Sequence, residues 1–292
     1  MQGLEYIHVN VFSPTPFSGN SLPVFIDAGA LSAHQMQRIT QELRHFECIF
    51  LETTPEPNTV RARVFDLFEE LPFAGHPIIG GAAALHHTFG QQAAQTWRVE
   101  LPSRSVAVTT ERTHEGFFGL LDQGTPEFLG TIDERQEVAQ AFNLELSDLH
   151  ADMPLEIVST GLRYLIVPVL PGALERARIA YDLTEMLRRL GSQFAVLLDE
   201  SKLEVRHWNN DGVIEDIATG SAAGTVGAYR LRHGLTRAGE TFVLNQGRFV
   251  GRPSQLRVRP EGTSAEVSTV NVGGHVSLVG HGQLDVLPEL SA

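Results

Sequence analysis

Three titratable side chains, Glu47, His76 and Asp216, are the residues of this sequence best placed to move a proton. Glu47 stands among apolar neighbours, where burial would raise its pKa and let it carry a proton near neutral pH. An imidazole at a helix start, as expected for His76, tends to stay neutral and can pass a proton. These residue types predict general acid/base catalysis. A surface glutamate and helix-capping roles for His76 and Asp216 are the alternatives that the local sequence leaves open.

The stretches around His76 and Asp216 repeat each other. Glu70, Gly75 and His76 recur as Glu215, Gly220 and Ser221, each at an offset of 145 (215 − 70, 220 − 75, 221 − 76), about half of the 292 residues. The repeat predicts two similar halves, each presenting one turn followed by a helix.

A helix that starts at a glycine is a natural anion site. Glycine lets the backbone pass close to a ligand, and the first helical turn leaves N–H donors unpaired. Two such starts facing one cleft would hold a small carboxylate, with His76 and Asp216 beside it. An ordinary packed helix start is the alternative, and the half-chain repeat favours the functional interpretation.

Periodicity and turn signals indicate how these turns are supported. A capping-box pattern at Ser32 and Gln35 starts a helix that should end near His45 or Phe46. Further helices are expected at 78–85 and 222–229, almost without polar residues and so buried on all sides. Two more are expected at 133–142, with a capping box at Asp133 and Gln136, and from Asp182 to Gly191. Strands are expected at 6–12, 22–26, 48–51, 60–65, 97–101, 105–110, 117–121, 156–159, 164–169, 203–208, 240–245, 255–259, 265–272 and 276–279.

These elements predict an α+β fold of two similar domains, each a curved, mostly antiparallel sheet wrapped around a central helix, with the active site in the cleft between them. We expect the domains at 1–130 and 150–292, with the last residues packing back on the first domain. The boundary should lie between about Pro126 and Pro154.

Composition excludes several classes of function. A net charge of −13 disfavours nucleic acids and anionic membrane surfaces as partners. The N-terminus lacks the pattern of a signal peptide, and no apolar run approaches the ~18 residues of a membrane span. The single cysteine, Cys48, excludes an internal disulfide and any zinc site built from several cysteines. A reducing, cytoplasmic location is expected.

No pattern for a metal or organic cofactor is found. Glu42 and His45 have the spacing of carboxylate-bridged metal sites, but one copy supplies too few ligands. His86 and His87 should point to different faces of their helix. The sequence contains no phosphate loop and no dinucleotide-binding fingerprint, and Ser221 does not stand in a Gly-x-Ser-x-Gly elbow. The sequence therefore predicts chemistry without a cofactor.

At these residues the chain strongly resembles the PhzF-like isomerases of phenazine biosynthesis, which share the two-domain diaminopimelate epimerase fold. The resemblance rests on Glu47 after the first helix and on a set of motifs along nearly the whole chain. These motifs are Phe17-Ser18-Gly19-Asn20, residues 71–77, Val158-Ser159-Thr160-Gly161-Leu162, residues 215–222, Gln246-Gly247 and Gly251-Arg252-Pro253-Ser254.

The resemblance implies a cofactor-free biosynthetic isomerase, a homodimer that acts on a small cyclic or amino-acid-like carboxylate. Glu47 would be the acid/base that moves a proton between carbons, and His76 and Asp216 its supporting polar pair. The residues that contact the substrate would be Gly75, Gly220 and Ser221. Phe46 and Ile217 differ from the residues that are usual in this family at those positions. These differences bear on the identity of the substrate more than on the reaction class.

Racemases and epimerases of the same fold carry a thiol on each glycine turn, at positions that match Ala74 and Thr219 here. With no thiol at either, that two-thiol mechanism is not available, and the expected role of Cys48 is packing. Two other functions stay open: an epimerase that uses Glu47 as one base, and a non-catalytic protein that binds small anions.

Overall fold

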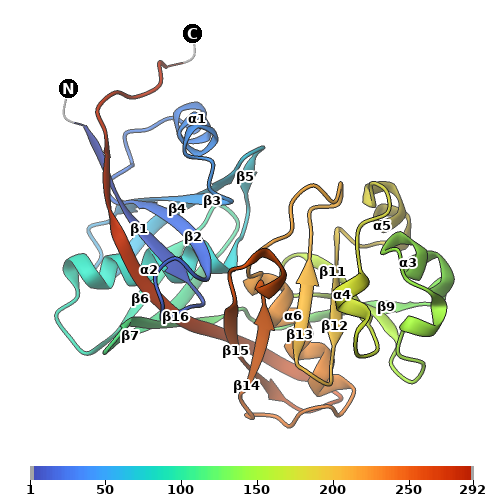
Figure 1. The fold of residues 1–292 in the computed structure, drawn as a ribbon. Helices are drawn as coiled ribbons and strands as arrows, with labels where there is room; N and C mark the ends of the chain where they lie inside the picture. The colour runs from blue at the N-terminus through green and yellow to red at the C-terminus, as the bar shows by residue number, and fades with distance from the viewer. Residues whose placement is uncertain (1–2, 291–292) are drawn as a thin grey trace. The chain divides into compact units, whose positions relative to one another are not determined.

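Helices α2 (Gly75–Phe89) and α6 (Gly220–Arg232) both begin at the glycine that the sequence repeat singles out. The computed structural model describes residues 3–290 and has a mixed α and β fold with a large sheet and few helices (Figure 1). Twelve consecutive residues of each of these two helices are buried, from the starting glycine onward. As expected from their composition, neither helix has a solvent face along that length.

Small residues allow this burial because neighbouring strands approach the helix backbone closely. A Cβ on Gly80 of α2 would lie 2.5 Å from Cδ2 of Leu22, and one on Gly227 of α6 would lie 2.5 Å from Cγ1 of Val258. Any larger residue at either position would force the adjacent strand away.

The described chain divides into two compact units, unit 1 of residues 3–122 and 273–290, and unit 2 of residues 123–272. The first division falls after Asp122, before the region expected from the sequence, because β9 (Glu127–Ile132) pairs with β10 (Leu155–Ser159) of unit 2. Strand β16 (Val267–Leu284) contributes residues to both units.

Unit 1 contains seven strands in the order β1-β2-β3-β4-β6-β7-β8, with the short β5 beside β4 and the later part of β16 beside β1. Helix α2 packs against β1, β2, β3, β7 and β8. The strands are β1 (Leu4–Val11), β2 (Asn20–Phe25), β3 (Glu47–Thr53), β4 (Thr59–Asp66), β5 (Glu70–Leu71), β6 (Ala94–Glu100), β7 (Ser105–Thr113) and β8 (Gly116–Asp122).

Unit 2 has the strand order β15-β14-β13-β12-β11-β10-β9, and α6 packs against β10, β11 and β15. Its remaining strands are β11 (Arg163–Pro168), β12 (Phe194–Asp199), β13 (Glu204–His207), β14 (Phe242–Gln246) and β15 (Ser254–Gly262). Its shorter helices are α3 (Arg135–Ala141), α4 (Ala173–Arg176) and α5 (Thr184–Leu190), with 3-10 turns η1 (Leu146–Asp148) and η2 (Arg248–Val250).

Strand pairing follows the same sequence in both units. Pairs β1–β2, β3–β4 and β6–β7 are antiparallel, whereas β2–β3 and β4–β6 are parallel. In unit 2, pairs β10–β11, β12–β13 and β14–β15 are antiparallel, whereas β11–β12 and β13–β14 are parallel. The repeat read from the two glycine turns therefore extends to the strands that lead to them.

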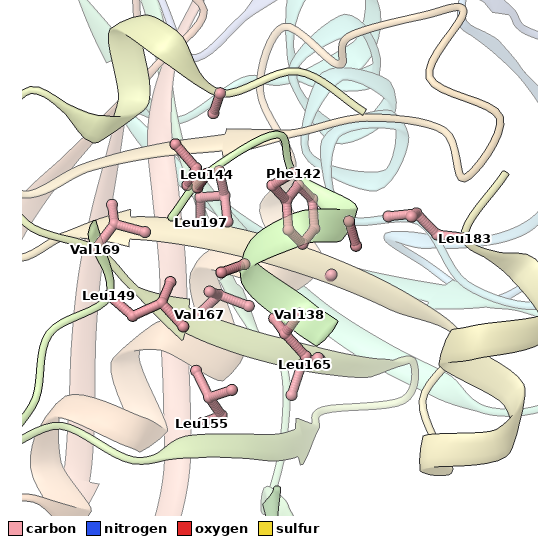
Figure 2. Close-up of a cluster of buried hydrophobic side chains, with 14 of the residues drawn as sticks. Val138, Phe142, Leu144, Leu149, Leu155, Leu165, Val167, Val169, Leu183 and Leu197 are labelled. Atoms are coloured by element: carbon pink, nitrogen blue, oxygen red, sulfur yellow. The ribbon is translucent and has the colours of Figure 1, made fainter. Parts of the chain in front are cut away.

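On the other face of the strands, each unit has an apolar cluster covered by helices. Helix α1 (Ala33–Leu43) covers one built around Phe25, Phe50 and Phe65. Figure 2 shows the cluster of unit 2, where Val138 of α3 and Phe142, which follows α3, pack with apolar side chains of β11 and β12, among them Leu165 and Leu197. The strands that carry site residues are thus packed on both faces.

Most elements expected from the sequence are present, but the short elements β5 and α4 were not expected, and other differences follow. The two strands expected at 265–272 and 276–279 are one long strand, β16, whose pairing continues through Gly273 and Gly274. Strands β12 and β9 were not predicted. β12 is a short buried apolar run next to a short helix, and only the helix was recognised. The capping box at Asp133 is wrong, because α3 begins at Arg135, with Glu134 as a cap that makes no side-chain bond.

The capping box at Ser32 is confirmed, and it makes a stability prediction. The backbone N–H of Gln35 donates to Ser32 Oγ at 3.3 Å, and the N–H of Ser32 donates to Gln35 Oε1 at 3.1 Å. Ser32→Ala should lower the free energy of unfolding by about 1 kcal/mol. Asp133→Ala is the matched control and should stay within about 0.5 kcal/mol of the parent. Urea denaturation measures both; equal losses would contradict the assignment.

Candidate active site

In unit 1, Glu47 and His76 form a buried contact. Glu47 is the first residue of β3 and His76 the second residue of α2, and their side chains are 10% and 4% exposed. The distance from His76 Nε2 to Glu47 Oε2 is 3.2 Å. Two residues 29 positions apart in the sequence (76 − 47) are thereby brought within hydrogen-bonding distance.

Asn20, the first residue of β2, fixes how His76 carries its proton. Its Nδ2 lies 3.4 Å from His76 Nδ1, and Asn20 is fully buried. An amide nitrogen can only donate, so Nδ1 accepts and neutral His76 carries its proton on Nε2. Nε2 lies 3.2 Å from Glu47 Oε2, but the two atoms are not aligned as a hydrogen bond. The two titratable groups are therefore close neighbours in a buried setting, which is the arrangement expected of an acid/base centre.

In unit 2, Asp216 belongs to a second buried network. Its Oδ2 accepts a hydrogen bond from Thr219 Oγ1 at 2.5 Å. Gln246 binds the same turn from β14, donating to Thr219 Oγ1 and to the carbonyl of Asp216, and accepting from the N–H of Thr219. All three side chains are buried.

This network leaves the start of α6 without a side-chain cap. Thr219 is the N-cap residue, a position where a threonine hydroxyl usually accepts from the first-turn amides. Here the hydroxyl is engaged by Asp216 and Gln246 instead. α2 likewise begins with an uncapped residue, Ala74, and neither helix has an acidic residue in its first turn. Both starts keep donors that could bind an anion.

The second residue of each helix is held by a side chain from a matching strand of its unit, β2 in unit 1 and β11 in unit 2. Asn20 of β2 bonds His76, and Tyr164 of β11 bonds Ser221, with Tyr164 Oη 2.8 Å from Ser221 Oγ. Gln123 adds a further bond in unit 2, donating to the carbonyl of Gly220 at 2.8 Å. The structure thus places all six candidate residues at two helix starts: Glu47, Gly75 and His76 in unit 1, and Asp216, Gly220 and Ser221 in unit 2.

Each turn is also anchored by a bidentate arginine–glutamate pair. Arg63 on β4 binds Glu70 at 2.7 and 2.6 Å, and Arg206 on β13 binds Glu215 at 2.9 and 2.5 Å. Glu70 and Glu215 each stand five residues before the helix glycine (75 − 70, 220 − 215). Their recurrence in the sequence is explained by this pairing, which attaches the turn to the preceding strand.

No role was predicted for three supporting residues, Asn20, Gln246 and Tyr164. Asn20 and Gln246 belong to motifs of the resemblance, but no local pattern shows that they reach His76 and Thr219, which lie 56 and 27 positions away. Tyr164 read only as part of a strand. A buried polar residue on an apolar strand was the signal available for Asn20 and Tyr164, since such groups require a partner.

Within residues 3–290, no group of three or more His, Cys, Asp or Glu side chains is arranged to hold a metal ion. Over the same residues, none of the helices is both long and apolar enough to cross a membrane.

Cys48 adjoins Glu47 but is chemically different. It is buried in the α1 cluster, and burial raises the pKa of its thiol to about 12. Because the thiolate is the nucleophile, about one molecule in 10⁴ would be reactive at pH 8. Thiol reagents should label the folded protein far more slowly than the urea-unfolded protein, as followed by mass spectrometry. Rapid labelling of the folded protein would contradict this burial.

The two arginine–glutamate pairs differ in burial, so their loss should differ in cost. The side chains of Arg206 and Glu215 are 4% and 9% exposed, against 34% and 29% for Arg63 and Glu70. Arg206→Met should destabilise the fold by about 3–5 kcal/mol, because Glu215 would be left buried without its cation. Arg63→Met, the matched change in unit 1, should cost about 0–1 kcal/mol. Denaturant unfolding measures the free energy of unfolding of both variants. Similar losses of stability would contradict the expected difference in cost.

Comparison with known proteins agrees with this geometry. The profile of the family described as phenazine biosynthesis-like protein matches residues 9–282. Trans-2,3-dihydro-3-hydroxyanthranilate isomerase of Pseudomonas chlororaphis is 31% identical over 96% of this chain and 99% of that protein.

Solved structures show the same relationship. A predicted epimerase of Pseudomonas aeruginosa superimposes with a TM-score of 0.92 at 47% identity, covering 97% of this chain and 99% of that one. A hydroxyproline epimerase of Agrobacterium vitis shares the fold, with a TM-score of 0.66 at 13% identity over 97% and 94% of the two chains. The resemblance read from the motifs is confirmed: the chain belongs to the phenazine biosynthesis-like family and is an isomerase.

Proposed function

We propose that this protein is a cofactor-free isomerase that moves a proton between carbons of a small carboxylate, with Glu47 as the acid/base. The observation that carries the proposal is the buried contact of 3.2 Å between Glu47 and His76. It provides a carboxylate that can accept a proton, beside an imidazole that can donate one.

In the reaction that we propose, Glu47 removes a proton from one carbon of the substrate. The electron pair of the broken C–H bond forms a new double bond to the adjacent carbon, while the π pair of the old double bond moves to its far carbon, which takes the proton back from the protonated Glu47. No electrons or protons are gained or lost, so no redox partner is needed. His76, whose Nε2 lies 3.2 Å from Glu47 Oε2, would stabilise the carboxylate form of Glu47.

The uncapped helix starts would bind the substrate carboxylate, through Gly75 in unit 1 and through Gly220 and Ser221 in unit 2. We propose that Asp216 acts in support, because its bond to Thr219 keeps the Thr219 hydroxyl away from those amides. We also propose that the two units are similar domains, each organised around its buried helix. The expected homodimer and cytoplasmic location stay predictions.

The name of the Pseudomonas chlororaphis relative suggests a substrate class. That protein acts on a partly saturated ring that bears a carboxylate, an amine and a hydroxyl. We propose a cyclic or amino-acid-like carboxylate for this chain as well. A proton NMR screen of such acids in deuterated water would find the substrate, because carbon exchange is visible without knowledge of the product.

An epimerase is the second candidate, favoured by the 47% identical structure described as a predicted epimerase. The positions that would carry two thiols are Ala74 and Thr219, the N-cap residues of α2 and α6. Neither supplies a thiol, so an epimerase here would have to use Glu47 as one of its bases. A chiral assay that shows inversion without migration of a double bond would favour this function.

Glu47→Gln tests the acid/base assignment. The amide keeps the shape of the side chain but cannot carry the proton, so turnover should fall by ~10²–10⁴-fold or more. A carboxylate ligand should still bind, since the helix starts are proposed to hold it. Folding should persist, because a neutral amide costs no more to bury than a carboxylate. Exchange of substrate protons with deuterated water, measured by NMR, reports the loss.

Glu52→Gln is the matched control, the same change on the same strand at a partly exposed position that pairs with Arg61. It should keep the parent exchange rate. If Glu47→Gln exchanges as fast as the parent while His76→Asn or Asp216→Asn does not exchange, Glu47 is not the acid/base.

A further inference from the structure

His207, which the proposed mechanism does not use, lies beside the start of α6. It is the last residue of β13, and its carbonyl accepts the backbone N–H of Asp216 at 2.9 Å. Its ring packs edge-on against Tyr164, with centroids 5.5 Å apart, and Tyr164 in turn bonds Ser221. Phe194 completes a group of three rings, 5.4 Å from Tyr164 and 5.7 Å from His207.

Strand geometry places this ring on the α6 side of the sheet. Alternate residues of a strand point to opposite faces. Arg206 and Trp208, on either side of His207, belong to the opposite face, where the Arg206 guanidinium lies 4.3 Å from the Trp208 ring and Trp208 joins the apolar cluster of unit 2. His207 therefore shares its face with Tyr164, whose hydroxyl reaches α6.

The hydrogen bonds of His207 fix its tautomer. Nδ1 lies 2.8 Å from the carbonyl oxygen of Ala195, which can only accept, so Nδ1 carries the proton. Burial lowers the pKa of His207, partly opposed by the charge of Asp216, and the ring is neutral at neutral pH. Nε2 is then a hydrogen-bond acceptor, and residues 3–290 offer it no donor.

His207 as a residue is 95% buried, but its Nε2 atom is not itself enclosed by the protein. A ligand that carries a donor can therefore reach this acceptor. The rings of Tyr164 and Phe194, tilted by 33° to each other and edge-on to His207, add apolar surface near Ser221.

We propose that His207 Nε2 accepts a hydrogen bond from a hydroxyl or amino group of the substrate, so that unit 2 selects ring carboxylates that bear a donor group. The inference rests on the proposed function, since it requires a carboxylate at the start of α6. His207 is a specificity-determining residue in this scheme and takes no part in the proton transfer.

Three planar acids test the proposal: benzoate, 3-hydroxybenzoate and 2-aminobenzoate, titrated calorimetrically into the parent protein and into His207→Met. In the parent, at least one donor-bearing acid should bind about three- to tenfold more tightly than benzoate. His207→Met should abolish that preference and leave the affinity for benzoate unchanged. His233→Met, which changes a histidine of the same unit that bonds Glu156, is the matched control and should keep the preference.

A second measurement needs no variant. Nitrogen NMR of histidine-labelled protein should show His207 Nε2 unprotonated in the free protein, with its signal shifted by the preferred acid and unmoved by benzoate. A protonated Nε2, or a preference that survives in His207→Met, would overturn the proposal. If benzoate binds and no preference exists, this proposal alone fails. If none of the three acids binds, it fails together with the carboxylate site.

Discussion

The burial of two helices on every side is the constraint on which the rest of this structure depends. Strands can surround α2 and α6 only where the helix surface is small, as at Gly80 and Gly227, where a Cβ would come within 2.5 Å of a neighbouring side chain. The same burial shields the first helical turns from solvent. Their unpaired amides then need a partner other than bulk water. Thr219, the one N-cap residue able to supply it, is bound to Asp216 instead. Both helix starts are therefore buried without a side-chain cap.

On this shared frame the two units carry different chemistry. The second helical residue is held in both by a side chain from a matching strand, β2 or β11, yet it is an imidazole in unit 1 and a hydroxyl in unit 2. The strand that follows α1 begins with Glu47, whereas β12 begins with Phe194. A buried glutamate and histidine thus lie together at one helix start, and a group of aromatic rings lies beside the other.

Several features of the fold could be predicted because each is visible in a short stretch of the sequence. These are the two motifs repeated at an offset of 145 residues, the small-residue helices and the capping box at Ser32. Contacts between distant residues could not be predicted in this way. Nothing near Asn20 indicates that it reaches His76, and the neutral state of His207 depends on a carbonyl on β12. The missed strand β12 shows the same limit, because a short buried apolar run has no periodicity to distinguish it from a helix.

The arginine–glutamate pairs link the repeat to the precision of the site. A turn that must present unpaired amides cannot be held by those amides, so it needs an anchor from elsewhere. Glu70 and Glu215 provide it through paired bonds to the preceding strand, and such planar pairs fix direction as well as distance. In unit 2 the anchor is stronger: Arg206 also donates to the carbonyls of Leu174 and Ala177 and lies over the rings of Trp208 and Phe249. Asp216 is the residue next to this anchor, and the position of its carboxylate against Thr219 follows from it.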